Sequence, residues 1–473
     1  MGEASRCWRL PRKEWRPHCC MPDSVASMAR VLVATPEPIG RRLAGPAIRA
    51  AQITRVLSAS HDVTLSSLAG ESVSPIDGHE VKGPGAINGD FDAAIVQGSV
   101  LLEHRDLVES EIPLVVDWFD PFHLEALHRS GDDPIRTHDL VEGARRTLRE
   151  QAQRGDFFLC SNHAQREHWL GWLAAAGRLN MASHDDDPLF ESLIAVAPFG
   201  IGTDKPGRRT PIRETFSVIG PEDPILLWAG GLHDWLDPLL FIRAMPTILD
   251  ENPDTRLVFL AGRHPNTSIE TMGIRGEAIS LARKMRMFGK NVLFVNDWVD
   301  YRDRLTWLND ATLGVVGDRA HLESRYSHRT RLLDHLAAGL PTVSTAGDPL
   351  SQQLHESGAA LTIPRDPDHE HAEALGRTIA ALVSDDARLR EMSKAASELA
   401  TGLSWEETLS PLLRWLEQPR MAADRQSGVR VEPAAQASSV SRLGDRIRLH
   451  LDAGGAKQVV ERGLRAGRRR FRR

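Results

Sequence analysis

Short apolar runs recur along the first half of the chain, with intervals between them that are long enough for a helix. The first run, 31–34, ends at Thr35 and Pro36, as expected of a buried parallel strand that leads into a loop. A helical pattern follows, with Ile48, Ile53, Val56 and Leu57 on one face. Further strand-like runs lie at 63–65, 93–96, 113–116, 157–160 and 193–196. This alternation predicts an α/β domain with a doubly wound sheet.

The same alternation starts again after a change of composition. Residues 198–224 are rich in Gly, Pro, Arg and Thr, which is typical of a connection between domains. A second series of runs lies at 225–229, 257–261, 292–295, 313–316, 342–344 and 360–363. The chain is therefore expected to form two Rossmann-like domains that face each other across a cleft. Open sheets of this kind bind ligands at the carboxyl ends of their strands.

These patterns divide the chain into six segments. We expect an unstructured extension, a first Rossmann-like domain, a linker, a second Rossmann-like domain, a closing amphipathic helix, and a final linker with a basic amphipathic tail. Their bounds are 1–28, 29–203, 204–223, 224–403, 404–419 and 420–473.

Composition is typical of an ordinary soluble protein. The 473 residues are 41% hydrophobic and 26% charged, which suffices for two or three cores. No run approaches the roughly 20 apolar residues of a membrane span, and the first 30 residues contain no apolar signal core. We therefore expect a cytoplasmic protein. Its four cysteines lack the spacing of a zinc site and predict no disulfide framework: Cys7, Cys19, Cys20 and Cys160.

Charge is distributed unevenly. The net charge is −6, yet residues 442–473 contain eleven Lys and Arg against three acidic residues. Apolar side chains at helical spacing accompany them: Val440, Leu443, Ile447 and Leu451. Two interpretations stay open, namely a tail that holds the protein on an anionic inner membrane surface and a solvated tail without a partner. A nucleic-acid partner is not expected.

Residues 323–343 contain the most informative pattern. A helix is predicted there, capped by Ser327 and ended by Gly339, with Arg329 and Arg331 near its first turn. Free backbone N–H groups and two guanidinium groups suit a diphosphate. Asp334, one turn further on, would accept hydrogen bonds from ribose hydroxyls. The plain alternative is an amphipathic helix with ordinary solvated charges.

This stretch resembles the acidic donor-binding motif of the family 4 glycosyltransferases, which are retaining enzymes of GT-B fold. The resemblance implies that Glu323 contacts the donor sugar and that Asp334 contacts the ribose. Ten residues separate the two acids here instead of the family's usual seven, and the second acid is Asp instead of Glu. The resemblance extends over roughly residues 30–416. It implies that the first domain, 29–203, is the acceptor-side domain and that the second, 224–403, is the nucleotide-sugar-binding domain.

Two glycine turns of the second domain also match this family. Residues 226–231 end in Gly230 and Gly231, and residues 257–262 end in Gly262, after which Arg263 follows. Glycine allows close approach of the backbone to a nucleotide, although paired glycines also end many ordinary strands. The lysine that commonly follows the first turn in the family is replaced by the segment from His233, so an arginine would have to supply the phosphate charge. The candidates are Arg263, Arg329 and Arg331.

Two segments of the first domain are the candidates for the opposite wall of the cleft. Residues 40–49 resemble the family's loop that faces the donor phosphates, with Gly45, Pro46 and Arg49 as candidates, unless this is a solvated basic loop. Residues 117–125 follow a strand, and family members place a His or Asp there beside the reacting carbon. The candidates are, in order, Asp117, Asp120 and His123; the alternative is a capped helix start.

The sequence therefore predicts a retaining glycosyltransferase that moves a sugar from a nucleotide-diphosphate donor to a hydroxyl of a glycan or lipid-linked acceptor. Synthesis of a cell-surface polysaccharide or glycoconjugate is the expected setting. Its catalytic candidates are Asp117, Asp120, His123 and Glu323. Neither a cofactor nor a metal is expected. Two alternatives remain, a GT-B sugar-nucleotide epimerase and a non-catalytic binder of sugar nucleotides or glycans.

Overall fold

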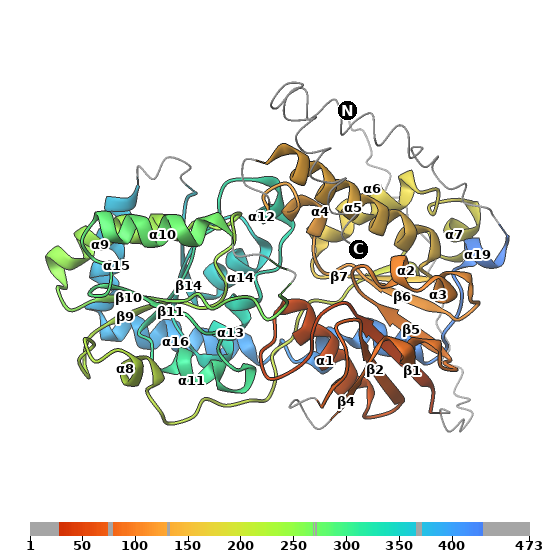
Figure 1. Cartoon of the computed structure of the whole chain (residues 1–473), viewed down its shortest axis with the longest axis horizontal. Coiled ribbons are helices and arrows are strands. Elements are labelled where there is room, and N and C mark those ends of the chain that lie inside the picture. Colours follow the sequence, from red (N-terminus) through yellow and green to blue (C-terminus); the bar gives the residue numbers. More distant parts are fainter. Residues whose placement is uncertain are drawn as a thin grey trace, which may run out of the picture.

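The computed structural model describes residues 28–73, 79–129, 133–267, 269, 272–365 and 371–428. Two lobes lie side by side, and each contains a sheet with helices on its faces (Figure 1). The predicted extension, apart from Met28, and residues 429–473 with the basic tail fall outside the described residues.

The first lobe is built on a sheet whose described strands run in the order β3-β4-β2-β1-β5-β6-β7-β8. All neighbours pair in parallel except β3 and β4, which are antiparallel. The six predicted runs all form strands, because each is apolar enough to be buried in the sheet. The two extra strands, β3 and β4, are short, polar and at the edge. The bounds are β1 Arg30–Thr35, β2 Asp62–Ser67, β3 Ser72–Val73, β4 Glu80–Lys82, β5 Ala93–Val96, β6 Leu114–Asp117, β7 Phe157–Cys160 and β8 Ile194–Val196.

Helices of this lobe connect its parallel strands. The predicted helix after Pro46 is α1, and the long α5 covers the sheet beside the cleft (Figure 1). The bounds are α1 Gly45–Leu57, the 3-10 helix Pro84–Asn88, α2 Val100–Glu103, α3 Arg105–Glu109, α4 Phe122–Glu125, α5 Pro134–Arg154, α6 His163–Ala175 and α7 Met181–Asp186.

The second lobe contains a parallel sheet in the order β11-β10-β9-β12-β13-β14. Each strand coincides with a predicted run to within a residue at either end. The strand bounds are β9 Ile225–Trp228, β10 Arg256–Leu260, β11 Val292–Val295, β12 Leu313–Val316, β13 Thr342–Thr345 and β14 Ala360–Ile363. The helix bounds are α9 Pro238–Glu251, α10 Gly273–Lys284, the 3-10 helix Tyr301–Asp303, α11 Arg304–Asn309, α12 Leu322–Tyr326, α13 Thr330–Ala338, α14 Pro349–Ser357, α15 Ala372–Val383 and α16 Asp386–Ala400.

The predicted linker is folded in its second half. Helix α8, Pro211–Thr215, lies there, and the backbone N–H of Ile212 donates to Asp310 of the second lobe over 2.8 Å. Arg213 pairs with the same carboxylate. Residues 211–215 therefore belong to the second lobe in packing.

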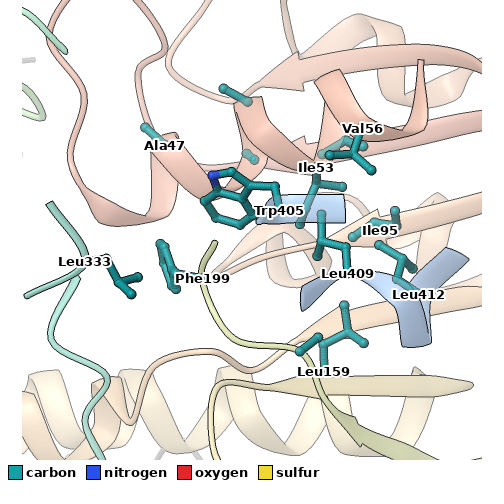
Figure 2. Close-up of a cluster of buried hydrophobic side chains, with 14 of the residues drawn as sticks. Ala47, Ile53, Val56, Ile95, Leu159, Phe199, Leu333, Trp405, Leu409 and Leu412 are labelled. Atoms are coloured by element: carbon teal, nitrogen blue, oxygen red, sulfur yellow. The ribbon is translucent and has the colours of Figure 1, made fainter. Parts of the chain in front are cut away.

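After the second lobe the chain returns to the first. The predicted closing helix is two helices, α17 Trp405–Thr408 and α18 Ser410–Leu416, because Pro411 in the first turn of α18 lacks the N–H that a continuous helix needs. Figure 2 shows Trp405, Leu409 and Leu412 packed among side chains of the first lobe such as Ile53 and Leu159.

The residues that follow are anchored, although a linker was expected from residue 420. Helix α19, Ala423–Gln426, holds Asp424 against Arg178, with 2.5 Å between Oδ2 and Nε and no exposure of either side chain. Arg425 contacts Asp156 over 2.6 Å. Residues 420–428 are thus part of the first lobe.

Both sheets reverse their strand order at one point, between β1 and β5 in the first lobe and between β9 and β12 in the second. Loops that leave such a switch point diverge and open a crevice at the carboxyl edge of the sheet. The loops after β1 and after β9 border the same cavity between the lobes. Among the described residues, no helix combines the length and the apolar character that a bilayer crossing requires.

Candidate functional site

A cavity of about 630 Å³ lies between the lobes and is lined by both. The first lobe contributes the loop after β1, the start of α1, the segment from β6 through α4, and part of α5. The second contributes the glycine turn after β9 and the residues from Ser327 to Asp334 around the start of α13. Most of the predicted site residues are therefore brought together in one cleft.

Arg331 extends to the glycine turn after β9. Its Nη2 donates to the carbonyl of Gly231 over 3.2 Å, and its guanidinium lies 5.1 Å from the ring centre of Trp228. Gly230 has a φ of 105°, a conformation that favours glycine. Nη1 of Arg331 is buried and has no hydrogen-bond partner among the described residues. Burial, aided by Arg329, lowers the pKa of Arg331 to about 10, so the group stays charged at neutral pH.

The helix after this arginine begins later than predicted. Its first residue is Thr330, and the capping position is Arg329, with no side-chain cap. Ser327 does not cap this helix, because it closes the short α12 and its hydroxyl donates to the carbonyl of Ser324 over 3.1 Å. The helix ends at Gly339 with a φ of 62°, as predicted.

Arg329 was predicted to bind a diphosphate, but its guanidinium is already engaged by acidic side chains. Its Nη1 and Nη2 donate to the two carboxylate oxygens of Glu323 over 2.8 and 2.7 Å, and Nη2 also lies 2.8 Å from Asp318. Two acids thus neutralise one buried guanidinium. Glu323 lies in α12 instead of a loop, is 1% exposed, and directs its oxygens to Arg329. Glu323 borders the cavity, but both of its oxygens are already paired with Arg329, so the predicted contact with the donor sugar stays a prediction.

Asp334 lies at the cleft edge of α13 with one oxygen engaged. Its Oδ1 accepts from Nε of Arg304 over 3.0 Å, and Arg304 also binds Asp204 over 3.0 Å. Burial raises the pKa of Asp334, and the Arg304 charge opposes that rise. The other carboxylate oxygen of Asp334 and the place of this residue one turn after Arg331 agree with the predicted ribose contact. That contact stays a prediction.

Arg49 does not line the cavity, contrary to its prediction, whereas Asp117 borders the cavity as predicted but has its oxygens engaged by protein groups. Arg49 lies inside α1, fully buried, where its Nε contacts both oxygens of Asp117 over 2.9 and 2.8 Å. Nη2 of Arg49 donates to the carbonyl of Ala197, and Gln97 donates to Asp117. The pair therefore joins α1 to the ends of three strands and presents no free charge to a ligand. Gly45 and Pro46 do line the cleft, at the start of α1.

Asp120 is the predicted first-lobe carboxyl that borders the cavity without an arginine partner. Glu125, which the sequence reasoning did not select, lies on α4 and forms a side-chain hydrogen bond with it. Burial, followed by the nearby Glu323, raises the pKa of Asp120 to about 6. Burial, followed by the charges of Asp120 and Glu323, raises the pKa of Glu125, while the charge of Arg129 opposes the rise. Its position five residues after Asp120, in the same segment that follows a strand, was the signal for it.

His123 points away from the cleft, contrary to its predicted place beside the reacting carbon. Its Nε2 lies 3.2 Å from Nε2 of His168, and the two rings stack. Trp169 and Trp172 surround them. Burial, with the His168 charge, lowers the pKa of His123 to about 4, so the ring is neutral near pH 7. It belongs to an aromatic cluster between α4 and α6.

Gly262 and Arg263 also depart from their predicted roles. A Cβ on Gly262 would lie 2.2 Å from the backbone nitrogen of Trp298, so this glycine admits the loop after β11 and not a nucleotide. Arg263 lines a separate groove with Arg41, Arg42 and Asp300. Neither is part of the wall formed by Arg331.

Two further cleft residues, both missed from the sequence, carry unpartnered polar atoms. Gln97 is 1% exposed, and its Oε1 has no hydrogen-bond partner among the described residues. Both ring nitrogens of His328 are likewise unpartnered, and burial lowers its pKa to about 3. Nothing in their sequence neighbourhoods distinguishes them.

No group of three or more His, Cys, Asp or Glu side chains within the described part of the chain is arranged to hold a metal.

Solved structures share this architecture. Sucrose-phosphate synthase from Thermosynechococcus elongatus superposes with a TM-score of 0.59 and 14% identity, over 82% of this chain and 98% of that one. WaaG, a glycosyltransferase involved in lipopolysaccharide biosynthesis, gives 0.56 and 14%, over 84% and 100%. Anabaena Alr3699/HepE in complex with UDP-glucose gives 0.57 and 12%, over 82% and 99%. No family model matches the chain, and no curated protein matches it by sequence. The likeness confirms the predicted GT-B fold.

Proposed function

We propose that the chain is a glycosyltransferase that uses a nucleotide-diphosphate sugar. The observation that carries this proposal is the free Nη1 of Arg331 beside the Gly230–Gly231 turn, in a cavity walled by two Rossmann-like lobes. A charged donor that is desolvated and without a protein partner is suited to an anionic ligand. That proteins of the same fold have been solved with UDP and UDP-glucose supports this choice of ligand.

The donor is proposed to lie with its diphosphate at this turn and at the first N–H groups of α13. The helix terminus and Arg331 then stabilise the charge that develops as the anomeric carbon–oxygen bond breaks. Asp334 is the proposed ribose contact. Arg329 supports the site indirectly, because its pairs with Glu323 and Asp318 fix the segment that precedes α13. Membership of family 4 and retention of the anomeric configuration are part of the proposal.

The acceptor is proposed to enter on the first-lobe side. Its hydroxyl oxygen forms the new bond to the anomeric carbon, the nucleoside diphosphate leaves, and the hydroxyl proton passes to a base. Asp120 is the proposed base, since Asp117 is occupied by Arg49 and Gln97. A carboxyl with a pKa near 6 accepts a proton at neutral pH more readily than an ordinary aspartate.

A glycan or lipid-linked acceptor, a role in polysaccharide or glycoconjugate synthesis, and a cytoplasmic location at the inner membrane face remain parts of the proposal. The membrane contact would be made by residues 442–473, which lie outside the described residues. Binding of the full chain, but not of a chain that ends at residue 428, to vesicles containing phosphatidylserine would support this contact. Equal binding by both chains would contradict it.

The experiment that tests the function is a screen of UDP-, GDP-, ADP- and dTDP-sugars. Thermal shift identifies the donor, and transfer of a labelled sugar to a panel of glycan and lipid-linked acceptors then measures activity. Donor-dependent transfer is the expected result. Conversion of the donor without an acceptor would indicate an epimerase, and tight binding without any transfer would indicate a binding protein.

A further inference from the structure

We infer that the acceptor bound on the first-lobe side of the cleft carries a positively charged amino group, recognised by Asp120, Glu125 and Glu37; this inference rests on the proposed function. Its class would be an amino sugar or a related aminated polyol. The argument comes from the chemistry of the polar atoms on that wall.

The acidic groups converge because of the sheet topology. Glu37 follows β1, Gln97 follows β5 and Asp120 follows β6, and these three strands are neighbours in the sheet. Glu125 returns from α4 to bond with Asp120. All four side chains border the same cavity. The carboxyl edge of adjacent strands thus gathers three acids and one amide.

The cations of the cleft do not neutralise these acids. Arg329 and Arg304 are engaged in pairs with acids outside this wall, as described above. Arg129 borders the same cavity, and among the described residues it forms no hydrogen bond and no ion pair within 4 Å. Its charge acts at longer range on Glu37, Asp120 and Glu125. The charge of Arg329 also reaches Asp120 and Glu125, but Arg329 is already paired with Glu323 and Asp318. The carboxyl groups near this wall therefore outnumber the guanidinium groups.

Gln97 gives an independent indication of the ligand. Its Nε2 is used by Asp117, so the amide orientation is fixed and Oε1 remains as an unpartnered acceptor in a side chain that is 1% exposed. A buried carbonyl oxygen without a donor is costly unless a ligand supplies one. Glu37 accepts from Asn266, and Asp120 bonds with Glu125, which leaves acceptor capacity on these carboxyl groups. Gln97 and the three acids are therefore suited to a ligand that presents hydrogen-bond donors.

An ammonium group meets both requirements. It has three donors and no acceptor, and its charge offsets the surplus of carboxylates. A hydroxyl can satisfy Gln97, but it leaves the crowded acids uncompensated. Burial is the largest cause that raises the pKa of Glu37, and it is also the largest cause that raises the pKa of Glu125. Such a rise is expected for acids that the protein does not fully compensate with positive charge.

The test compares acceptors that differ in a single group. Glucose is assayed beside 2-amino-2-deoxyglucose, 3-amino-3-deoxyglucose and 6-amino-6-deoxyglucose, with donor hydrolysis in the absence of acceptor subtracted. For at least one amine, kcat/KM should exceed that of glucose by about tenfold or more. The preference should grow between pH 5 and pH 7, as Asp120 loses its proton.

Variants test whether these acids cause the preference. Glu125→Gln and Glu37→Gln keep the shape of the side chains and remove charge, and each should reduce the ratio of amine to glucose several-fold. Glu109→Gln removes the same charge from an exposed position of α3 outside the cavity and should leave the ratio unchanged. Thermal unfolding of each variant checks that it is folded.

The outcomes separate the two proposals. If a nucleotide sugar stabilises the protein and is turned over, but no amine exceeds glucose, this inference is overturned and the proposed function stands. An amine preference that persists in both Glu125→Gln and Glu37→Gln would also overturn it. If no nucleotide shifts the unfolding temperature and no transfer occurs, the proposed function is overturned, and the inference with it.

Discussion

Arg331 differs from the other arginines near the cleft in what its guanidinium contacts. Arg49, Arg304 and Arg329 each lie against carboxylates, and their charges hold elements together. Arg331 contacts a carbonyl and an indole ring, and one of its nitrogens is unpartnered. Arg49 and Arg329 also have one buried nitrogen each without a hydrogen-bond partner among the described residues, but carboxylates already offset the charge of both groups. Arg331 is the one of these four arginines for which the described residues provide no carboxylate within 4 Å, so its charge is left for a ligand.

The acidic wall gives a prediction about stability and pH. The pKa of Asp120 is raised to about 6 by burial, whereas an unfolded aspartate titrates near 4. Between these values the folded state binds more protons, so this residue makes folding less favourable as pH rises from about 4 to 6.

Asp120→Asn should therefore raise the free energy of unfolding at pH 7.5, by about 1 to 3 kcal/mol, and change it little at pH 4. Urea denaturation at both pH values measures the difference. A variant that is less stable than the wild type at pH 7.5 would contradict the assigned environment.

Sequence reasoning located the residues of the site better than it assigned their partners. Asp120, Asp334 and Arg331 were placed at the cleft edge by the ends of strands and the start of a helix, and they do border the cavity. The contact between Arg49 and Asp117 depends on the face of α1 on which Arg49 lies and on the sheet order, in which β6 is two strands from β1. Such contacts between residues 68 positions apart have no local signal.

At the level of elements, the glycines after β9 and β10 look alike in sequence but differ in structure. Gly230 adopts a positive φ beside Arg331, whereas Gly262 is required by the close passage of the backbone at Asp297 and Trp298. The first shapes the site, and the second shapes the packing of the loop after β11.

Gly262→Ala should accordingly destabilise the protein by about 3 kcal/mol, because the new methyl group meets backbone atoms that cannot move aside easily. Gly276→Ala is the matched control: its Cβ would meet nothing within 4 Å on the exposed side of α10, and alanine should stabilise that helix by roughly 0.5 to 1 kcal/mol. Chemical denaturation measures both. Equal stability of the two variants would refute the packing argument.

The strands were predictable and several helix limits were not. Strands buried on both faces read as continuous apolar runs, which no surface element imitates. The edge strands β3 and β4 are too short and polar to stand out. The start of α13 was placed too early because Ser327 is a good capping residue by type, yet Arg329 extends from the capping position to Glu323 and Asp318.

For the whole molecule, the chain's return to the first lobe has an energetic consequence. Arg178 is fully buried, and Asp424 is its carboxylate partner. Loss of one member of a buried pair leaves an uncompensated charge and typically costs about 3 to 5 kcal/mol.

A chain that ends at Gln418 should therefore lose about that much unfolding free energy, while a chain that ends at Gly428 keeps every described contact and should match the full length. Urea unfolding followed by tryptophan fluorescence compares the three chains. If the chain ending at Gln418 were as stable as the other two, residues 419–428 would not anchor the first lobe.

The cleft itself depends on contacts between lobes that the sequence does not reveal. Gln165 and Asn162 donate to the carbonyl of Tyr326, and the indole of Trp298 donates to the carbonyl of Leu43. Two domains and a gap could be predicted from two series of strands. Which side chains would face each other across that gap followed only from the three-dimensional structure.

The most direct test of the central claim is calorimetric titration of UDP, GDP, ADP and dTDP into the wild type, Arg331→Ala and Arg263→Ala. The account predicts that at least one nucleoside diphosphate binds the wild type, that Arg331→Ala weakens its binding by about tenfold or more, and that Arg263→Ala, in the neighbouring groove, leaves it unchanged. Wild-type affinity in Arg331→Ala would contradict the account.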